Sequence, residues 1–287
     1  MKIKTNVSAL NAHRNLSDTQ RAASDSMAKL SSGFRINRAS DDAAGLGIAN
    51  QMRATTRALT QVSRNAEQAN SMLQIAEGST AGIQKMLERM KELATQAGSD
   101  TVDDDSRGRI QKEVDALAEE IQRTVDTTVF AGTKLLGGTG GAGSAGSFTF
   151  LIGSSADYAG QDKIDVTIAD LSAATLTVDA LDVSTVDSAR TALTNIDTAI
   201  SSVNEQLGDL GAYQNRIENA QSNLKTAIQN FSAAESVIRD LDMAEEMTKF
   251  SKNNILSQAG TAMLARAASA CRTRRTTPAL RWPGTAR

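Results

Sequence analysis

The fold is decided by residues 40–97, which read SDDAAGLGIANQMRATTRALTQVSRNAEQANSMLQIAEGSTAGIQKMLERMKELATQA. This stretch contains no proline, and its apolar side chains recur at steps that alternate between three and four. Such spacing places them on one stripe of an α-helix with a heptad repeat. At 1.5 Å per residue the helix is about 85 Å long, so it needs long partner helices to cover the stripe. The stripe consists of Ile48, Met52, Thr55, Leu59, Val62, Ala66, Ala69, Leu73, Ala76, Thr80, Ile83, Leu87, Met90, Ala94 and Ala97.

A second heptad stripe lies in the C-terminal half of the chain. It runs from Val186 to Phe231, and most of its positions are apolar. Two stripes of similar length predict that residues 41–136 and 184–236 form the two parts of one antiparallel helical bundle. We expect the seams of assembly to be formed by Leu59, Val62, Leu73, Ile83 and Leu87 in the first part and by Ile196, Ile200, Val203, Leu207, Leu224 and Ile228 in the second.

Three shorter helices are predicted around these two. Residues 1–40 contain a helix and a connector, and residues 237–265 contain a helix that brings the two termini together. Ser40 is the expected N-cap of the long helix. Asp103–Asp105 precede another stripe, Ile110 to Thr124, so we interpret these acids as a helix start rather than a metal site.

The middle of the chain, residues 137–183, is predicted to be a short region rich in β-structure. Six glycines between Gly137 and Gly146 predict a flexible linker. Apolar residues then alternate at 148–152 and 164–168, which predicts a β-hairpin at one end of the bundle. Leu176 and Val178 are expected to add a short third strand. The fold class is therefore mainly α, a long antiparallel coiled-coil bundle with a small β-hairpin region and paired termini.

Composition argues against several classes of function. The formal net charge of −2 disfavours nucleic acid as a main partner. One histidine, His13, and one cysteine, Cys271, cannot form the usual zinc site or a Ser-His-Asp triad. We therefore expect no enzyme activity, cofactor or metal. The first residues lack the apolar run of a Sec-type signal peptide, and no later stretch is long enough for membrane insertion.

Several motifs carry a resemblance to a known family. Leu30-Ser31-Ser32-Gly33-Phe34-Arg35-Ile36-Asn37, followed by Ser40-Asp41-Asp42-Ala43-Ala44-Gly45-Leu46, closely resembles the N-terminal signature of bacterial flagellins. Residues 3–12 resemble the start of those proteins, and residues 254–265 resemble their C-terminal helix. The resemblance covers roughly residues 1–136 and 184–265, and it implies that residues 137–183 are the variable region.

The resemblance implies a structural subunit that self-assembles into the filament of the bacterial flagellum for motility. It further implies export through the flagellar type III channel, a secreted and extracellular location, and a filament whose inner tube is formed by the terminal helices. A flagellar export chaperone and a cap protein are implied as partners. Two alternatives stay open: a hook–filament junction protein, which shares both terminal patterns, and a secreted adhesin of flagellin type.

The same resemblance suggests recognition by the innate immune receptor TLR5. Arg89, Leu93 and Glu113 match the receptor-binding pattern of the family one by one. These residue types are also typical of an ordinary solvated helix face with one apolar contact.

The last 22 residues depart from the family pattern. Residues 266–287 hold six arginines, no acidic residue and both prolines of the chain, Pro278 and Pro283. We expect this atypical basic tail to leave the helix before Thr276, because proline cannot continue a helix without losing a backbone hydrogen bond.

Overall fold

The computed structural model describes residues 7–138, 146–153 and 162–273, with side chains described as far as residue 266. The helices are α1 (Val7–Ser32), α2 (Ala43–Ala97), α3 (Asp104–Thr127), α4 (Val186–Arg239) and α5 (Met243–Thr273). The strands are β1 (Val129–Phe130), β2 (Thr133–Lys134), β3 (Ser147–Leu151) and β4 (Lys163–Thr167).

These elements form two compact units. Unit 1 consists of residues Met1–Ala54 and Phe231–Arg287, and unit 2 consists of Thr55–Asn230. Helices α2 and α4 therefore contribute residues to both units. The predicted boundaries of the functional domains stay a prediction.

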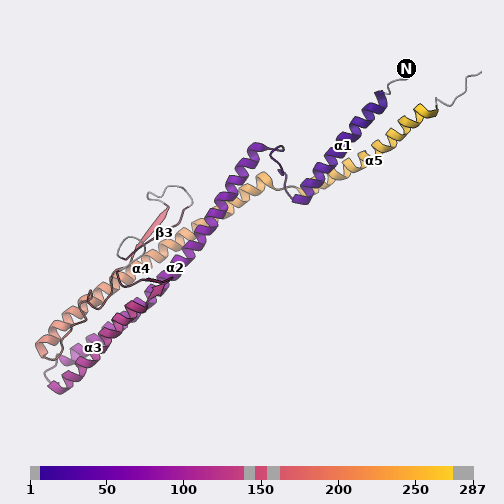
Figure 1. Cartoon of the computed structure of the whole chain (residues 1–287). Helices are drawn as coiled ribbons and strands as arrows, with labels where there is room; N and C mark the ends of the chain where they lie inside the picture. The colour runs from indigo at the N-terminus through magenta and orange to yellow at the C-terminus, as the bar shows by residue number, and fades with distance from the viewer. Residues whose placement is uncertain (1–6, 139–145, 154–161, 274–287) are drawn as a thin grey trace, which may run out of the picture. The chain divides into compact units, whose positions relative to one another are not determined.

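Unit 2 is a bundle in which α3 and α4 both run antiparallel to α2 (Figure 1). Gln221 and Gln214 of α4 donate hydrogen bonds to Glu67 and Glu77 of α2, and Lys91 of α2 pairs with Asp197 further back along α4. The predicted mainly α, antiparallel architecture is thus confirmed.

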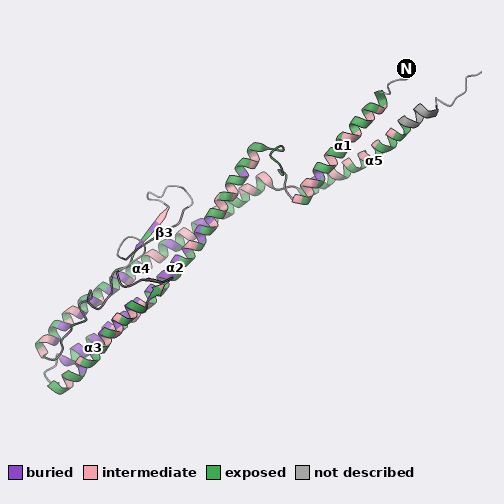
Figure 2. Cartoon of the chain, viewed as in Figure 1, coloured by how far each residue is buried: buried purple, intermediate pink, exposed green. Residues whose placement is uncertain are grey.

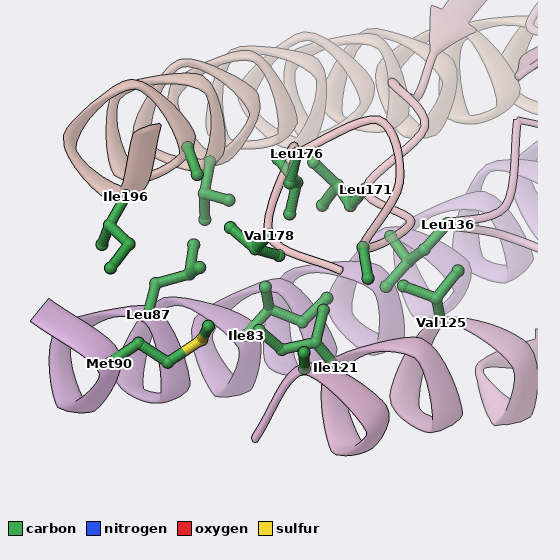
Figure 3. Packing of buried hydrophobic residues seen from close by; sticks show 14 of the residues in the cluster. Ile83, Leu87, Met90, Ile121, Val125, Leu136, Leu171, Leu176, Val178 and Ile196 are labelled. Carbon is green, nitrogen blue, oxygen red and sulfur yellow. The ribbon is translucent and has the colours of Figure 1, made fainter. Parts of the chain in front are cut away.

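The heptad stripe of α2 forms the core of this bundle. Every stripe position from Leu59 to Ala97 is buried, including Thr80, whose hydroxyl donates to the carbonyl of Ala76 at 2.7 Å. Figure 3 shows Ile83, Leu87 and Met90 of α2 among residues of α3, of α4 and of the chain between them. At the other end of α2 the stripe behaves differently, because Ile48 is exposed.

The predicted hairpin is present as β3 and β4, which pair antiparallel with Phe148 opposite Val166 and Phe150 opposite Ile164. Ile164 and Val166 are buried against the helices. The hairpin lies along α4 rather than at an end of the bundle, since Ile152 lines a hollow with Leu224. The predicted glycine-rich linker and the hairpin turn lie mostly outside the described residues.

A second ribbon, β1 paired with β2, was not predicted. Its two-residue turn has positive φ at both Ala131 (48°) and Gly132 (83°). Positive φ at both positions is the geometry that joins twisted strands most closely. Gly132 adopts positive φ without strain. The turn was missed because Ala131 stands where such turns usually have asparagine, aspartate or glycine.

The predicted third strand is wrong. Leu176 and Val178 are buried, but they lie in an irregular segment, residues 168–183, that forms turns and no strand. Its backbone bonds glutamine side chains of the flanking helices instead of a neighbouring strand. Gln111 accepts from the N–H of Val183 and donates to the carbonyl of Leu181, both at 2.7 Å.

Two further glutamines serve the same segment. Gln122 of α3 accepts from the N–H of Ala173, and Gln206 of α4 accepts from the N–H of Ala169 at 2.8 Å. Buried backbone groups need partners, so these side chains supply what a sheet would otherwise provide. The side chains of the segment can then fill the core between α3 and α4 without forming a strand.

The start of α2 differs from the prediction. Asp42, rather than Ser40, is the N-cap, because its carboxylate accepts from the N–H of Gly45 at 2.9 Å. Asp41 instead accepts from the N–H groups of Arg38 and, less closely, Asn37. These backbone hydrogen bonds, that of Arg38 first, lower the pKa of Asp41.

In unit 1, α1 and α5 run antiparallel side by side, which confirms that the terminal segments pair (Figure 1). Gly260 of α5 lies so close to Leu16 of α1 that an added Cβ would come within 3.1 Å of its side chain. The last helix begins at Met243 rather than at Val237, because α4 continues to Arg239. Asp242 caps it by accepting from the N–H groups of Ala244 and Glu245.

We predict that Gln111→Ala lowers the free energy of unfolding of the bundle by about 1 to 3 kcal/mol, because it removes the partner of two buried backbone groups. Urea unfolding followed by circular dichroism measures the change. The matched control is Gln84→Ala, since Gln84 bonds only Glu88 on its own exposed helix face. Equal stability of the two variants would show that the hydrogen bonds of Gln111 to the irregular segment do not stabilise the bundle.

Candidate assembly and recognition surfaces

Unit 1 has almost no core of its own. Among its described residues the only buried apolar side chains are Ile36 and Ala49, whereas the large core cluster lies wholly in unit 2. Figure 2 shows the same contrast, with buried residues along α2, α3 and α4 and mainly exposed or intermediate ones along α1 and α5. The helix pair is therefore held by few buried contacts within the chain.

The apolar residues of unit 1 are instead exposed. Of the thirteen exposed large apolar residues in the described part of the chain, all but Ile75 and Val129 belong to unit 1. Eight of the eleven lie on α1 or α5, and the other three on the parts of α2 and α4 in this unit; so much exposed apolar surface is typical of a surface that another chain covers. These residues, which we call the apolar set, are Val7, Leu10, Met27, Ile48, Phe231, Val237, Met243, Met247, Ile255, Leu256 and Met263.

The two connectors of unit 1 bind each other in a short clasp, residues 33–36 with 237–241. The N–H of Leu241 donates to the carbonyl of Gly33, and the N–H of Arg35 donates to the carbonyl of Arg239 at 2.7 Å. The guanidinium of Arg35 donates to the carbonyl of Ile238 at 2.6 Å. Carbonyls at a helix C-terminus lack partners within the helix, so Arg35 caps α4 with a positive charge.

Aromatic and charged side chains reinforce the clasp. The guanidinium of Arg239 lies 4.2 Å from the centre of the Phe34 ring, a cation–π contact. Glu235 accepts from Arg53 at 2.9 Å and lies 3.9 Å from Arg239. Residues 35–38 were predicted only to connect two helices. The structure shows that Arg35 also belongs to the clasp that binds the end of α4.

Packing also explains the glycine of the Asp-Asp-Ala-Ala-Gly motif. A Cβ at Gly45 would lie closest to the carboxylate of Asp42 and also within 2.9 Å of the buried side chain of Ile36. A larger residue at this position would therefore require the side chains of Asp42, the N-cap, and Ile36 to shift.

The three residues proposed for receptor recognition lie in unit 2. Arg89 of α2 donates two hydrogen bonds to Glu113 of α3, at 2.8 and 3.1 Å, and a third to Glu92. Glu113 first, and then Glu92, raises the pKa of Arg89 through these hydrogen bonds. Arg89 and Glu113 thus form one exposed, charged spot that bridges two helices.

Leu93 does not share that surface. Its side chain is only 2% exposed and belongs to the core of unit 2. In this conformation it can support the helix that carries Arg89, but it cannot contact a receptor directly.

The eleven predicted seam residues lie inside unit 2 of a single chain. Eight are buried, while Ile200, Leu207 and Ile228 are partly buried and pack against the buried clusters. Their packing accounts for the fold of the bundle, and their role in assembly stays a prediction.

Sequence reasoning missed Arg107. This buried residue donates from Nε to the carbonyl of Ala97 and from Nη2 to that of Ser99, both at 3.0 Å. It therefore caps the C-terminus of α2, and its third contact, to Asp104, balances its charge. Arg107 lies three residues after Asp104, the first acid of α3, and this spacing could have indicated the ion pair between them.

Within the described residues, no group of histidine, cysteine and acidic side chains could hold a metal ion. No helix in the same part of the chain is both long and apolar enough to cross a bilayer.

Comparison with known families matches both ends of the chain. Residues 3–140 match the description "Bacterial flagellin N-terminal helical region", and residues 193–271 match "Bacterial flagellin C-terminal helical region". The second match extends to Cys271, and the start of the atypical tail at residue 266 stays a prediction.

Similar proteins cover nearly the whole length. A flagellin of Halalkalibacterium halodurans and one of Bacillus subtilis are each 42% identical, over 267 and 292 residues; each alignment covers 93% of this chain and 96% of the relative. A flagellar filament 31.3 kDa core protein of Treponema maltophilum is 40% identical with the same coverage. The crystal structure of Bacillus cereus flagellin, 26% identical, covers 60% of this chain and 94% of its own with a TM-score of 0.49.

We predict that Arg35→Ala loosens the end of α4, because the carbonyls of Val237 and Ile238 lose a charged hydrogen-bond donor. Amide hydrogen exchange at residues 238–242 is expected to accelerate by about tenfold, the equivalent of about 1.4 kcal/mol. Arg38→Ala is the control, since its backbone rather than its side chain bonds Asp41. Unchanged exchange in Arg35→Ala would contradict the capping role.

Proposed function

The chain belongs to the bacterial flagellin family and is a structural subunit of the extracellular flagellar filament that serves motility; we propose that α1 and α5 form the surface through which its copies assemble. The single observation that carries this proposal is the apolar set of unit 1. Those side chains are exposed in the single chain although they are of the type that packs in cores.

The energetics favour covering this surface. Fully burying a large apolar side chain contributes about 1.5 to 3 kcal/mol, and each member of the set still exposes a third or more of its surface. Among the described side chains of α1 and α5 none that is apolar is buried, so the helix pair gains little of this free energy by itself. Neighbouring copies that present the same helices would supply the missing contacts.

The clasp supports the same role. It ties the start of α2 and the end of α4 to the helix pair, so that both terminal segments are presented together. We propose that a flagellar export chaperone and the filament cap protein are transient partners, because the apolar set needs cover before subunits reach their final positions.

The alternatives from sequence are less well supported. A hook–filament junction protein would share the terminal patterns, but the relatives reported above carry the names flagellin and filament core protein. An adhesin would need a ligand-binding region, and the described part of residues 137–183 consists of one hairpin and a segment packed into the core.

We further propose that TLR5 recognises the charged spot formed by Arg89 and Glu113. The guanidinium is held by two hydrogen bonds to Glu113, so its position is fixed before a partner arrives. Leu93 would contribute only indirectly, because its packing in the core of unit 2 holds α2 in position.

Assembly is tested by Ile255→Glu. Ile255 is 65% exposed, so the charge should leave the helical circular dichroism of the monomer unchanged while filament yield falls at least about tenfold, since a buried unpaired charge is strongly unfavourable. Sedimentation and electron microscopy measure the yield. The matched control is Ile75→Glu, an exposed isoleucine of unit 2, which should assemble. Normal filaments from Ile255→Glu would refute the proposed surface.

Receptor recognition is tested by Arg89→Ala and Glu113→Ala in a TLR5 reporter assay. Each variant should weaken the response several-fold, while stability changes by less than about 1 kcal/mol, as for other exposed ion pairs. The control is Arg123→Ala, which breaks the comparably exposed pair with Glu120 on α3. An equal response from all three variants, or none from the parent chain, would rule out this spot.

A further inference from the structure

The most exposed and the most buried of the described methionines lie in different units, whereas Met52 of unit 1 and Met86 of unit 2 are intermediate in exposure. In unit 2, Met72 and Met90 are buried, at 3% and 0% exposure. In unit 1, four methionines are about half exposed: Met27 (53%), Met243 (48%), Met247 (48%) and Met263 (61%). Dissolved oxidants can therefore reach these four thioethers more readily than those of Met72 and Met90.

Three of the exposed methionines lie at one level of the helix pair. Gly33 bonds Leu241 across the antiparallel pair, and Met27 lies six residues before Gly33, just as Met247 lies six residues after Leu241. Met243 lies one helical turn before Met247, so the two share a face of α5. All four methionines belong to the apolar set on which assembly is proposed to depend.

We propose that these four methionines are reversible oxidation sites through which peroxide controls assembly, an inference that rests on the proposed assembly surface. The thioether sulfur uses a lone pair to attack one oxygen of hydrogen peroxide. The S–O bond forms and the O–O bond breaks. The departing hydroxide then takes the proton from the oxygen bound to sulfur and leaves as water. Sulfur is oxidised to the sulfoxide, and the peroxide is reduced to water.

The product has the opposite preference for solvent. A sulfoxide oxygen is a strong hydrogen-bond acceptor, whereas the thioether is apolar. Packing it against a neighbouring chain without a donor is unfavourable. The buried Met72 and Met90 keep their thioethers, so the bundle survives and only the assembly surface changes.

The modification is also reversible in chemical terms. Methionine sulfoxide reductases return each epimer to the thioether. A subunit oxidised at α1 and α5 can thus regain its assembly surface without being resynthesised.

The test treats the full chain, with Cys271 alkylated beforehand, with dilute hydrogen peroxide. Peptide mass spectrometry should show oxygen added at the four exposed methionines at least about tenfold faster than at Met72 and Met90. The thermal melting of the bundle should be retained, filament yield should fall several-fold, and methionine sulfoxide reductases should restore it. Equal oxidation rates at exposed and buried methionines, or full assembly of the oxidised chain, would overturn the proposal.

A matched pair of variants separates this effect from other damage. The ratio of treated to untreated filament yield should stay near one for the combined variant M27L, M243L, M247L and M263L. The same ratio should fall for M72L and M90L as it does for the parent. An equal fall in both variants would overturn the oxidation proposal.

The two proposals fail in different ways. If untreated Ile255→Glu assembles as well as the parent, the assembly surface is wrong and the oxidation proposal falls with it. If Ile255→Glu does not assemble but the oxidised parent does, only the oxidation proposal is overturned.

Discussion

Burial of the apolar stripe of α2, from Leu59 to Ala97, is the interaction on which the rest of unit 2 depends. Helix α4 runs along this stripe, but α3 has only 24 residues against the 55 of α2. The core between α3 and α4 is not closed by helices alone. The irregular segment, residues 168–183, fills that space with Leu171, Leu176 and Val178 (Figure 3). The need for Gln111, Gln122 and Gln206 follows directly, because a buried irregular backbone has polar groups that require partners.

Periodic patterns predicted the helices well because burial and spacing agree along α2 and α4. The patterns failed where the partner lies far away in the sequence. Spaced apolar residues in 168–183 resemble a strand, yet Gln111 stands 70 residues before the carbonyl that it binds. Likewise, Ser40, Asp41 and Asp42 are all plausible N-caps, and only local hydrogen bonds distinguish them.

The recognition residues show a related limit. Spacing placed Arg89 and Leu93 one turn apart on the same helix, which is correct. It could not show that α3 and α4 both cover this part of α2, so that Leu93 is buried beside Met90 while Arg89 reaches out to Glu113. Similarly, the arginine that caps α4 stands more than 200 residues before the carbonyls it binds, and no local pattern reports it.

The N–H of Leu171 donates to the carbonyl of Leu136 at 3.0 Å, so the two ends of the hairpin region are joined at the core. Between these two leucines, Ile164, Val166 and Ile168 of the second half still belong to the core, whereas the loop that joins β3 to β4 is free to differ in length. Lengthening such a loop adds closure entropy only as the logarithm of its length. A foreign sequence inserted between β3 and β4, with the buried residues of β4 kept, would therefore change what the surface displays while leaving the register of the supporting helices as it is.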